Sequence, residues 1–361
     1  MDPIRNLHNS GQRIWLDNIT RELLSSGTLS CYIKQLFVTG LTSNPTIFHN
    51  ALNKGNAYDE SILFHASGGK SGEALFFELA LEDLTRAADL FRPIYDASEG
   101  LDGWVSLEVS PLLADDADNT IEAAIRLYAQ AGRPNFFIKI PGNRAGVSAI
   151  EEVVFAGVPV NVTLLFSEEH YLAAADAYMR GIERRIASGL DPKVRSVASV
   201  FVSRWDLAVQ GKTPPGLNNC LAIAIAKNIY KAYRNLYESA RWHTLSDSGA
   251  CQQTLLWAST GTKDPGSSDT LYIEALVAPD TISTMPEKTL LAFSDHGKVE
   301  GILPVDGGNA GSVLAAFNQA GIQSEELAFD LQRQGIDIFA KSWNDLVDSI
   351  REKSDILMQR K

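Results

Sequence analysis

Short apolar runs rich in β-branched and aromatic residues alternate with amphipathic stretches of helical period along nearly the whole chain. This alternation is typical of a parallel sheet built from repeated strand–helix units. Eight strands are predicted, at residues 12–17, 37–42, 103–109, 135–140, 158–165, 196–202, 253–259 and 270–276. Eight such units favour an α/β fold closed as a (β/α)8 TIM barrel over an open sheet.

The helices between these strands are predicted from the spacing of their apolar residues. Residues 71–91 place five apolar side chains on one face: Leu75, Leu79, Leu84, Ala88 and Phe91. A second helix begins near Asp115 and Asp116, where carboxylates suit the positive end of the helix dipole. Its predicted buried stripe is Ile121, Ile125 and Tyr128. A longer helix is expected over 217–241.

The chain after the last predicted strand is expected to form three further helices, packed on the barrel exterior, over 309–320, 324–333 and 342–360. No internal repeat, low-complexity tract or block of like charge divides the sequence. Glycine-rich stretches near 68–72 and 306–308 have the composition of loops rather than of linkers. We therefore predict one domain over residues 1–361.

Composition and charge narrow the classes of function. Of the 361 residues, 45% are hydrophobic and 21% charged, as in an ordinary globular protein. A net charge of -12 argues against nucleic acid or an acidic membrane surface as a partner. The N-terminus lacks the apolar segment of a signal peptide, no apolar run approaches the ~18 residues of a membrane span, and the three cysteines show no C-x-x-C spacing. We expect a soluble, cytoplasmic protein.

One lysine ends an otherwise apolar predicted strand. Lys139 follows a Phe-Phe-Ile run and stands just before the turn at Pro141 and Gly142. Burial of an ammonium group among apolar side chains favours its neutral form, and a neutral amine is a nucleophile toward a ketone carbonyl. A lysine at a strand end can also simply extend to solvent or to a carboxylate. The residues around it therefore decide between the two interpretations.

Polar side chains also lie near the ends of several other strands: Asp17, Thr42, Asn44, Glu108, Asn161, Thr163 and Ser199. The carboxyl ends of the strands in a parallel barrel meet at one mouth, so we expect these groups to surround Lys139. Each alone has an ordinary explanation, such as a helix cap at Asp17 or a turn at Asn44. Together, an amine, two carboxylates, amides and hydroxyls suit imine chemistry on a polyol.

Two cations follow the sixth and seventh predicted strands. Arg204 and Lys263 lie in loops that often bind phosphate in such barrels, although solvated surface cations would give the same pattern. No metal or nucleotide site is predicted. The six histidines lack metal-ligand spacing. The stretch Gly69-Lys70-Ser71 resembles the end of a P-loop, but Phe64 stands where its first glycine should be.

Seven motifs in this chain resemble those of the transaldolase family and follow in the family's order. They are Trp15–Asp17, Leu41–Phe48, Leu107–Ser110, Ile138–Pro141, Asn161–Ser167, Ser199–Arg204 and Trp257–Ser259. The insertion around 205–250 and the extended C-terminus resemble the longer-chain bacterial-type branch. The resemblance implies a barrel that transfers a dihydroxyacetone unit between ketose and aldose phosphates in the pentose phosphate pathway, without a metal or organic cofactor.

The resemblance also implies roles for individual residues. Lys139 would form a Schiff base with the donor ketone. Glu108 would act as acid and base through a water held with Thr163, and Asp17 would take the hydroxyl proton that starts carbon–carbon cleavage. The implied substrate-binding residues are Asn44, Asn161, Ser199, Phe201, Arg204, Ser259 and Lys263. Many family members carry an arginine after the seventh-strand Ala-Ser, and Lys263 is assigned here in its place on the phosphate.

The sequence leaves two other functions open. Fructose 6-phosphate aldolases, the lyase branch of the same fold, tend to carry a tyrosine at the position of Phe201, so Phe201 favours transfer. A barrel that binds sugar phosphates without catalysis would form no covalent adduct at Lys139. The expected partners are sugar phosphates, with no nucleic acid and no membrane, and the expected assembly is a monomer or a homodimer.

Overall fold

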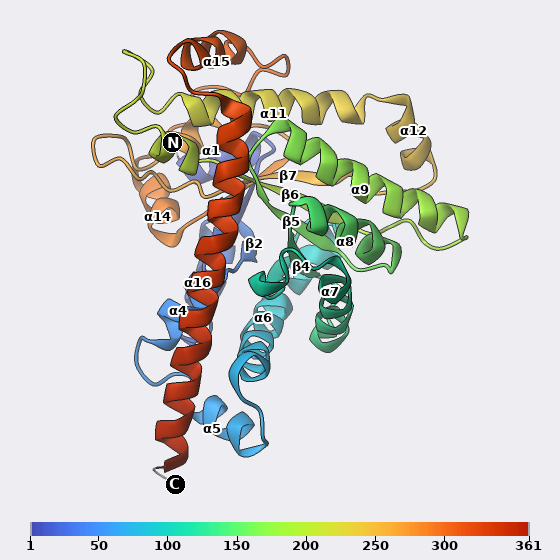
Figure 1. Ribbon diagram of the computed structural model, residues 1–361, viewed down its shortest axis with the longest axis vertical. Coiled ribbons are helices and arrows are strands. Elements are labelled where there is room, and N and C mark those ends of the chain that lie inside the picture. The colour runs from blue at the N-terminus through green and yellow to red at the C-terminus, as the bar shows by residue number, and fades with distance from the viewer. Residues whose placement is uncertain (1, 360–361) are drawn as a thin grey trace.

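The computed structural model describes residues 2–359, in which eight parallel strands close into a barrel in chain order (Figure 1). The strands are β1 (Arg13–Asp17), β2 (Val38–Thr42), β3 (Val105–Glu108), β4 (Phe136–Pro141), β5 (Val160–Leu165), β6 (Ser196–Phe201), β7 (Thr254–Ala258) and β8 (Thr281–Met285). Hydrogen bonds between β8 and β1 complete the ring. The predicted (β/α)8 fold is confirmed.

The eighth predicted strand is wrong. Residues 270–276 contain the short helix α13 (Leu271–Ala275), and the strand that closes the barrel lies further along, at Thr281–Met285. The segment Leu271–Ala275 is apolar except for Glu274, and so short a segment fits a helix as well as a strand. The threonines and serine of β8 make that strand hard to recognise in the sequence. The other seven predictions overlap β1 to β7.

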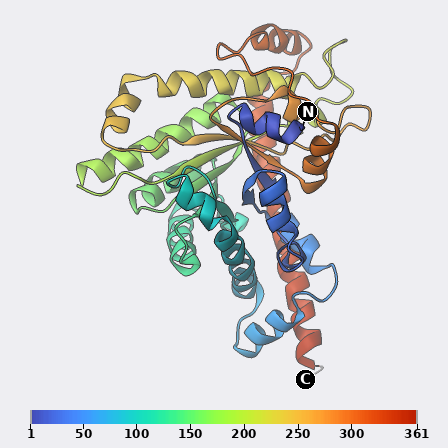
Figure 2. The same cartoon turned by 180° about the vertical axis from the view of Figure 1, so that it is seen from behind.

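Helices follow most strands and surround the barrel (Figures 1 and 2). They are α1 (Pro3–Asn9), α2 (Arg21–Ser25), α3 (Thr28–Gln35), α4 (Pro45–Leu52), α5 (Asp59–Ser67), α6 (Gly72–Ala97), the 3-10 turn η1 (Pro111–Leu113), α7 (Ala117–Ala131), α8 (Arg144–Phe155), α9 (Glu168–Ala187), α10 (Arg204–Ala208), α11 (Leu221–Tyr237), α12 (Ala240–Asp247), α13, α14 (Glu287–His296), α15 (Ala310–Gln319) and α16 (Ser324–Gln359). One helix was expected over 217–241, but the structure has two in this region, α11 and α12.

The predicted stripe of α7 is displaced from its real buried face. Ile121 and Tyr128 are half-buried and Ile125 is 40% exposed. The helix instead buries Thr120, Ala123, Ala124, Leu127 and Ala131. The small alanines allow α7 to lie close to α8 and β4, which the bulkier isoleucines would not.

The C-terminal helix α16 is continuous, where two helices with a break at 334–341 were predicted. Gly335 and Asp337 are weak helix formers, but packing of the helix on the barrel outweighs their propensity. The helix lies outside the barrel, as predicted, and passes from α15 along α4 to α5 (Figures 1 and 2). It also contacts η1 and β5, so it crosses the carboxyl ends of the strands.

Aromatic rings fill the barrel beneath those strand ends. Trp104 and Phe137 stack with ring centroids 4.1 Å apart, and Trp15 lies 6.2 Å from Phe137. The Trp15 indole N–H donates to buried Asp102 at 2.9 Å. Because side chains alternate along a strand, the next residues on the same faces as Trp15 and Phe137 stand directly above this layer.

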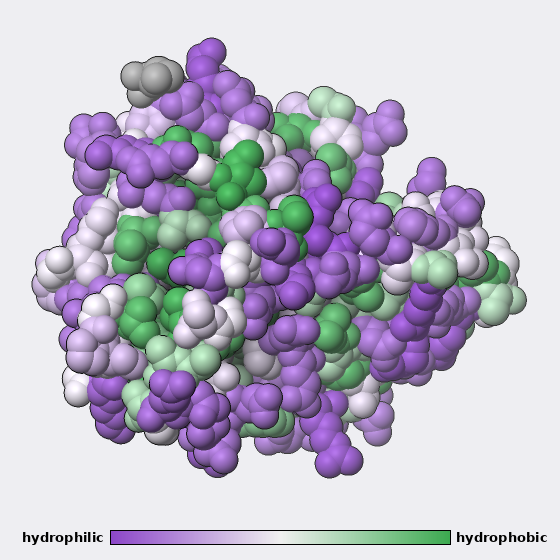
Figure 3. All heavy atoms as spheres, turned by 90° about the horizontal axis from the view of Figure 1, so that it is seen from above, coloured by the Kyte–Doolittle hydropathy of each residue, from purple (hydrophilic) through white to green (hydrophobic). Residues whose placement is uncertain are grey.

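Polar side chains dominate the face shown in Figure 3, and apolar residues appear between them in patches. Within residues 2–359, no helix combines the length and apolar character needed to cross a bilayer.

We predict that Gly40→Ala destabilises the barrel. A Cβ at Gly40 would lie 2.6 Å from the Trp15 ring and 2.8 Å from the Trp104 carbonyl oxygen, so the aromatic layer would have to shift. Overpacking of this kind costs about 1–3 kcal/mol, which urea unfolding would measure. The matched control is Gly311→Ala in α15, where nothing lies within 4 Å and stability should be unchanged or slightly raised. Equal stability of the two variants would contradict the prediction.

Candidate active site

The strand register places three polar residues side by side at the barrel mouth. Glu108 on β3 and Asn161 on β5 both pair with Lys139 on β4 between them. Lys139 Nζ donates to Glu108 Oε2 at 3.1 Å and to the Ser43 carbonyl oxygen at 3.2 Å. Lys139 and Glu108 are each only 4% exposed. The lysine is therefore buried, but against a carboxylate rather than among apolar groups alone.

Asp17 joins this pair from the end of β1. Its carboxylate accepts a hydrogen bond from Thr42 Oγ1 at 2.8 Å, and Thr42 in turn bonds Thr284 of β8. Burial raises the pKa of Asp17, opposed by the positive charge of Lys139, the Thr42 hydrogen bond and the charge of Lys263. The three predicted ionisable groups, Asp17, Glu108 and Lys139, thus lie within one electrostatic cluster.

The same forces act on Glu108. Burial raises the pKa of its carboxyl group, the charge and hydrogen bond of Lys139 lower it, and the charge of Asp17 raises it further. A carboxyl group whose pKa is raised holds its proton more readily than an ordinary one, which suits a group that exchanges protons with a substrate. Both carboxylates therefore have the electrostatic setting of acid–base groups.

A chain of neutral hydrogen bonds runs across the neighbouring strands. Ser199 Oγ donates to Asn161 Oδ1 at 2.7 Å, and Asn161 Nδ2 donates to Ser106 Oγ at 3.1 Å. All three side chains are buried. These bonds fix the orientation of the Asn161 amide, so the predicted pair of Asn161 and Ser199 is rigidly placed.

Thr163 is turned by an irregularity in β5. The register with β6 shifts between Val162 and Leu165, and Leu164 adopts a left-handed backbone with φ of 58°. Thr163 Oγ1 is buried, as is Glu108 Oε1, and neither makes a hydrogen bond within residues 2–359. Buried polar atoms normally have a partner, so these two mark a place where a polar ligand is needed.

Arg204 begins α10, just beyond the end of β6. Its guanidinium lies 5.6 Å from the Phe201 ring centre, and it forms no ion pair or hydrogen bond with any residue between 2 and 359. Burial lowers the pKa of Arg204, because desolvation disfavours its charge. A largely desolvated cation without an anionic partner is costly, which indicates an anionic ligand.

Comparison of the whole chain with known proteins points to one family. The family model for Transaldolase/Fructose-6-phosphate aldolase matches residues 14–350. A transaldolase of Parafrankia sp. (strain EAN1pec) is 43% identical over 361 residues, covering 97% of this chain and 98% of the relative. The chain belongs to the transaldolase/fructose-6-phosphate aldolase family. A transaldolase of Thermobifida fusca is 41% identical, and transaldolase 2 of Nostoc punctiforme is 39% identical, each over at least 96% of both chains.

Asn44 and Ser259, which were also assigned by resemblance to this family, make hydrogen bonds to other residues of the chain. Asn44 Oδ1 caps α4 by accepting the Ile47 N–H at 3.1 Å, although the side chain stays half-buried at the mouth. Ser259, with φ of 54°, shares a 3.0 Å hydrogen bond with Ser203. Both therefore shape the loops of this transaldolase-family barrel, whatever else they contact.

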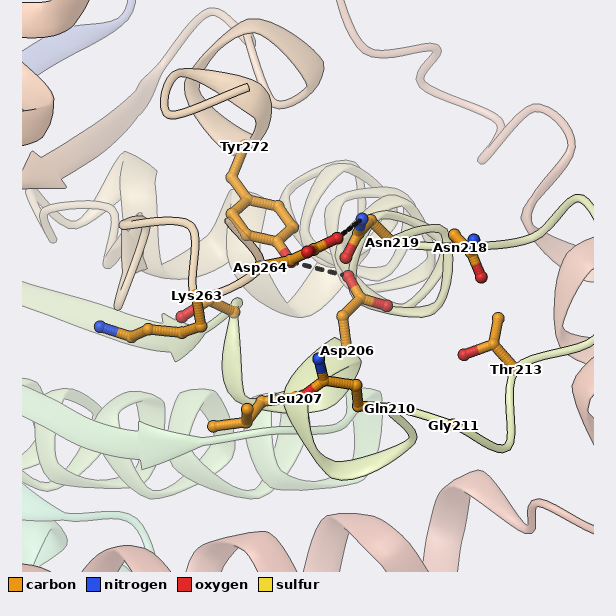
Figure 4. Close-up of a pocket in the computed structure, with 11 residues that line it drawn as sticks. Asp206, Leu207, Gln210, Gly211, Thr213, Asn218, Asn219, Lys263, Asp264 and Tyr272 are labelled. Carbon is orange, nitrogen blue, oxygen red and sulfur yellow. Dashed lines mark hydrogen bonds between the residues drawn. The ribbon is translucent and has the colours of Figure 1, made fainter. Parts of the chain in front are cut away.

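Lys263 is exposed, in the loop after β7, and its charge reaches Asp17. It borders a pocket of about 240 Å³ between the loops that follow β6 and β7, but Figure 4 shows its side chain pointing away from Asp206 and Asn219. Asp206 accepts from two backbone N–H groups of α11 and from Tyr272. This carboxylate-lined pocket does not suit phosphate. Within residues 2–359, no cluster of three or more metal-ligand side chains occurs.

The sequence did not reveal Phe339 or Thr284 as site residues of this transaldolase-family protein. The Phe339 ring, on α16, lies 5.6 Å from Lys139 Nζ and 6.0 Å from Arg204 Cζ. In the sequence, Phe339 has the same helical spacing as Trp343, which packs on Phe76 and Phe77, so nothing separated the two. Thr284 was missed because β8 was misplaced.

We predict that Asp17→Asn stabilises the protein in a pH-dependent way. The folded-state pKa of Asp17 lies above its ordinary 3.8, so the parent loses stability as pH rises from there through the folded-state value. Asparagine avoids this loss and can still accept the Thr42 hydrogen bond. The free energy of unfolding of the variant should increase relative to that of the parent as pH rises, and the difference should then become constant. Urea unfolding between pH 4 and 8 checks this, and an offset independent of pH would refute it.

Proposed function

We propose that this chain is a transaldolase of the pentose phosphate pathway. It would interconvert sedoheptulose 7-phosphate and glyceraldehyde 3-phosphate with erythrose 4-phosphate and fructose 6-phosphate. The observation that supports this most strongly is a buried lysine held by a carboxylate at the mouth of a barrel of this family. Relatives that are named transaldolase, and that align with nearly the whole chain, add to that support.

The first step forms an imine at Lys139. Its neutral amine adds to the donor ketone carbon, and the resulting carbinolamine loses its hydroxyl group as water. Glu108 supplies the proton through a water molecule that it shares with Thr163. The buried, unpartnered Glu108 Oε1 and Thr163 Oγ1 support this placement. The product is an iminium ion, which withdraws electrons from the adjacent carbons.

The second step breaks the carbon–carbon bond. Asp17 takes the proton of the C4 hydroxyl group, the C3–C4 bonding electrons move toward the iminium nitrogen, and an aldose phosphate leaves. The dihydroxyacetone unit stays on Lys139 as an enamine. The raised pKa of Asp17 suits a group that must accept this proton and return it later.

The third step reverses the second with a new aldehyde. The enamine carbon attacks the acceptor carbonyl, Asp17 returns its proton to the new hydroxyl group, and water releases the product ketose from Lys139. The hydroxyl groups of the dihydroxyacetone unit would bind the neutral side chains at Asn44, Asn161 and Ser199. The lysine supplies the electron sink, so this scheme uses no cofactor.

Arg204 and Lys263 are proposed to bind the substrate phosphate, with Phe201 and Ser259 beside it. The unpaired, partly buried guanidinium of Arg204 is the stronger support. The assembly that we propose is a monomer or a homodimer. A role in central sugar metabolism supports a cytoplasmic location.

We predict that Lys139→Met lowers transfer from fructose 6-phosphate to erythrose 4-phosphate by at least about 10⁴-fold, because it removes the nucleophile. A coupled assay for glyceraldehyde 3-phosphate release would measure this. Lys34→Met, at an exposed position near the end of α3, is the matched control and should leave the rate unchanged.

The same assay separates transfer from simple cleavage. A transaldolase should release little free dihydroxyacetone from fructose 6-phosphate, with or without acceptor. Equal and rapid release in both cases would identify a lyase and reject our proposal, as would normal turnover by Lys139→Met.

A further inference from the structure

Hydrogen bonds hold the C-terminal helix α16 against the barrel mouth and fix its position along the helix axis. Gln332 Nε2 donates to the carbonyl oxygens of Gly142, just after β4, at 3.2 Å and of Leu164, near the end of β5, at 2.9 Å. Ser342, further along α16, accepts from Thr46 at 2.9 Å. These bonds join α16 to the ends of β4 and β5 and to α4, and they oppose sliding of the helix over the barrel.

A close contact fixes the same face of the helix. Gly335 lies one turn after Gln332, and a Cβ there would come within 2.8 Å of Leu164 Cδ2. Leu164 itself has the left-handed backbone that accompanies the turn of Thr163. The absence of a side chain at Gly335 therefore allows α16 to approach the strand that carries Thr163.

Phe339, one further turn along this face, reaches the site itself. Its ring is 5% exposed and lies 5.6 Å from Lys139 Nζ and 6.4 Å from the Phe201 ring centre. The Arg204 guanidinium lies 6.0 Å from the centre of the Phe339 ring. An apolar ring thus lies close to both the proposed nucleophile and the proposed phosphate ligand, near enough to each cation for cation–π attraction.

We propose that Phe339 determines how the enamine is partitioned between transfer and hydrolysis, by keeping bulk water from the bound imine on the α16 side, away from the one water molecule that Glu108 and Thr163 share. This inference rests on the transaldolase function proposed above. The Phe339 ring covers Lys139 from the α16 side, while Glu108 and Asn161 adjoin it on the neighbouring strands. Exclusion of water from a reactive intermediate is a general role of the groups that close an active site.

The side reaction that Phe339 would suppress is hydrolysis of the intermediate. The enamine takes a proton on carbon and becomes the iminium ion of dihydroxyacetone. Water then adds to the iminium carbon and loses a proton, the C–N bond breaks, and the Lys139 amine leaves with a proton as the ketone forms. The sum is enamine plus water giving dihydroxyacetone plus free amine, with no oxidation or reduction. Transfer instead requires the enamine to survive until an aldehyde arrives.

The test compares two rates in each variant: release of free dihydroxyacetone from fructose 6-phosphate alone, and transfer from it to erythrose 4-phosphate. We expect the ratio of release to transfer to rise about fivefold or more in Phe339→Ala, because the truncated side chain admits water. The matched control is Ile338→Ala, the preceding residue on α16, whose side chain is 47% exposed. Its ratio should equal that of the parent.

A ratio is used because a merely structural role for Phe339 would lower both rates together. Equal loss of release and transfer in Phe339→Ala would therefore overturn the proposal. Phe339→Leu keeps apolar bulk without the ring. If the alanine variant does not fold, the leucine variant decides the matter: a rise in the ratio of release to transfer supports the proposal, and an unchanged ratio refutes it. Failure of the parent protein to transfer at all would instead reject the proposed function.

Discussion

The hydrogen-bonded pair of Lys139 and Glu108, buried at the carboxyl ends of two adjacent strands, is the interaction on which the candidate site depends. Taking two charges out of water is costly, and their mutual attraction offsets the cost only when the geometry is good. The strand register supplies that geometry, and the Ser43 carbonyl oxygen accepts a second bond from the ammonium group. The aromatic layer beneath, with Phe137 two residues before Lys139, keeps water from entering from below.

Several neighbouring features work against the stability of the fold. Burial raises the pKa of both Asp17 and Glu108, so each costs stability when ionised, and the Arg204 guanidinium has no ion-pair or hydrogen-bond partner within residues 2–359. Proteins tolerate such local costs where function requires them. In our proposal, the same features supply a proton acceptor, a proton donor and an anion site. The long helix α16, anchored by Gln332, closes the mouth above them.

Much of this was readable from the sequence, since side chains alternate along strands and parallel strands end at one mouth. That rule predicted that five residues lie near one another at the mouth: Lys139, Glu108, Asp17, Asn161 and Ser199. It failed at β8, whose polar residues conceal a strand, and at α16, whose continuity depends on packing. Phe339 could not be found because its partners come from distant strands. At Asn44, an ordinary turn was foreseen as the alternative, and the structure shows instead that its side chain caps α4.

The most direct test of the central claim is borohydride reduction of the protein in the presence of fructose 6-phosphate, followed by peptide mass spectrometry. If a nucleophilic amine is held at the barrel mouth, reduction should leave one stable dihydroxyacetone-derived adduct, on the peptide that contains Lys139. An adduct on a different lysine, or none in a protein that is active on this ketose, would contradict the account.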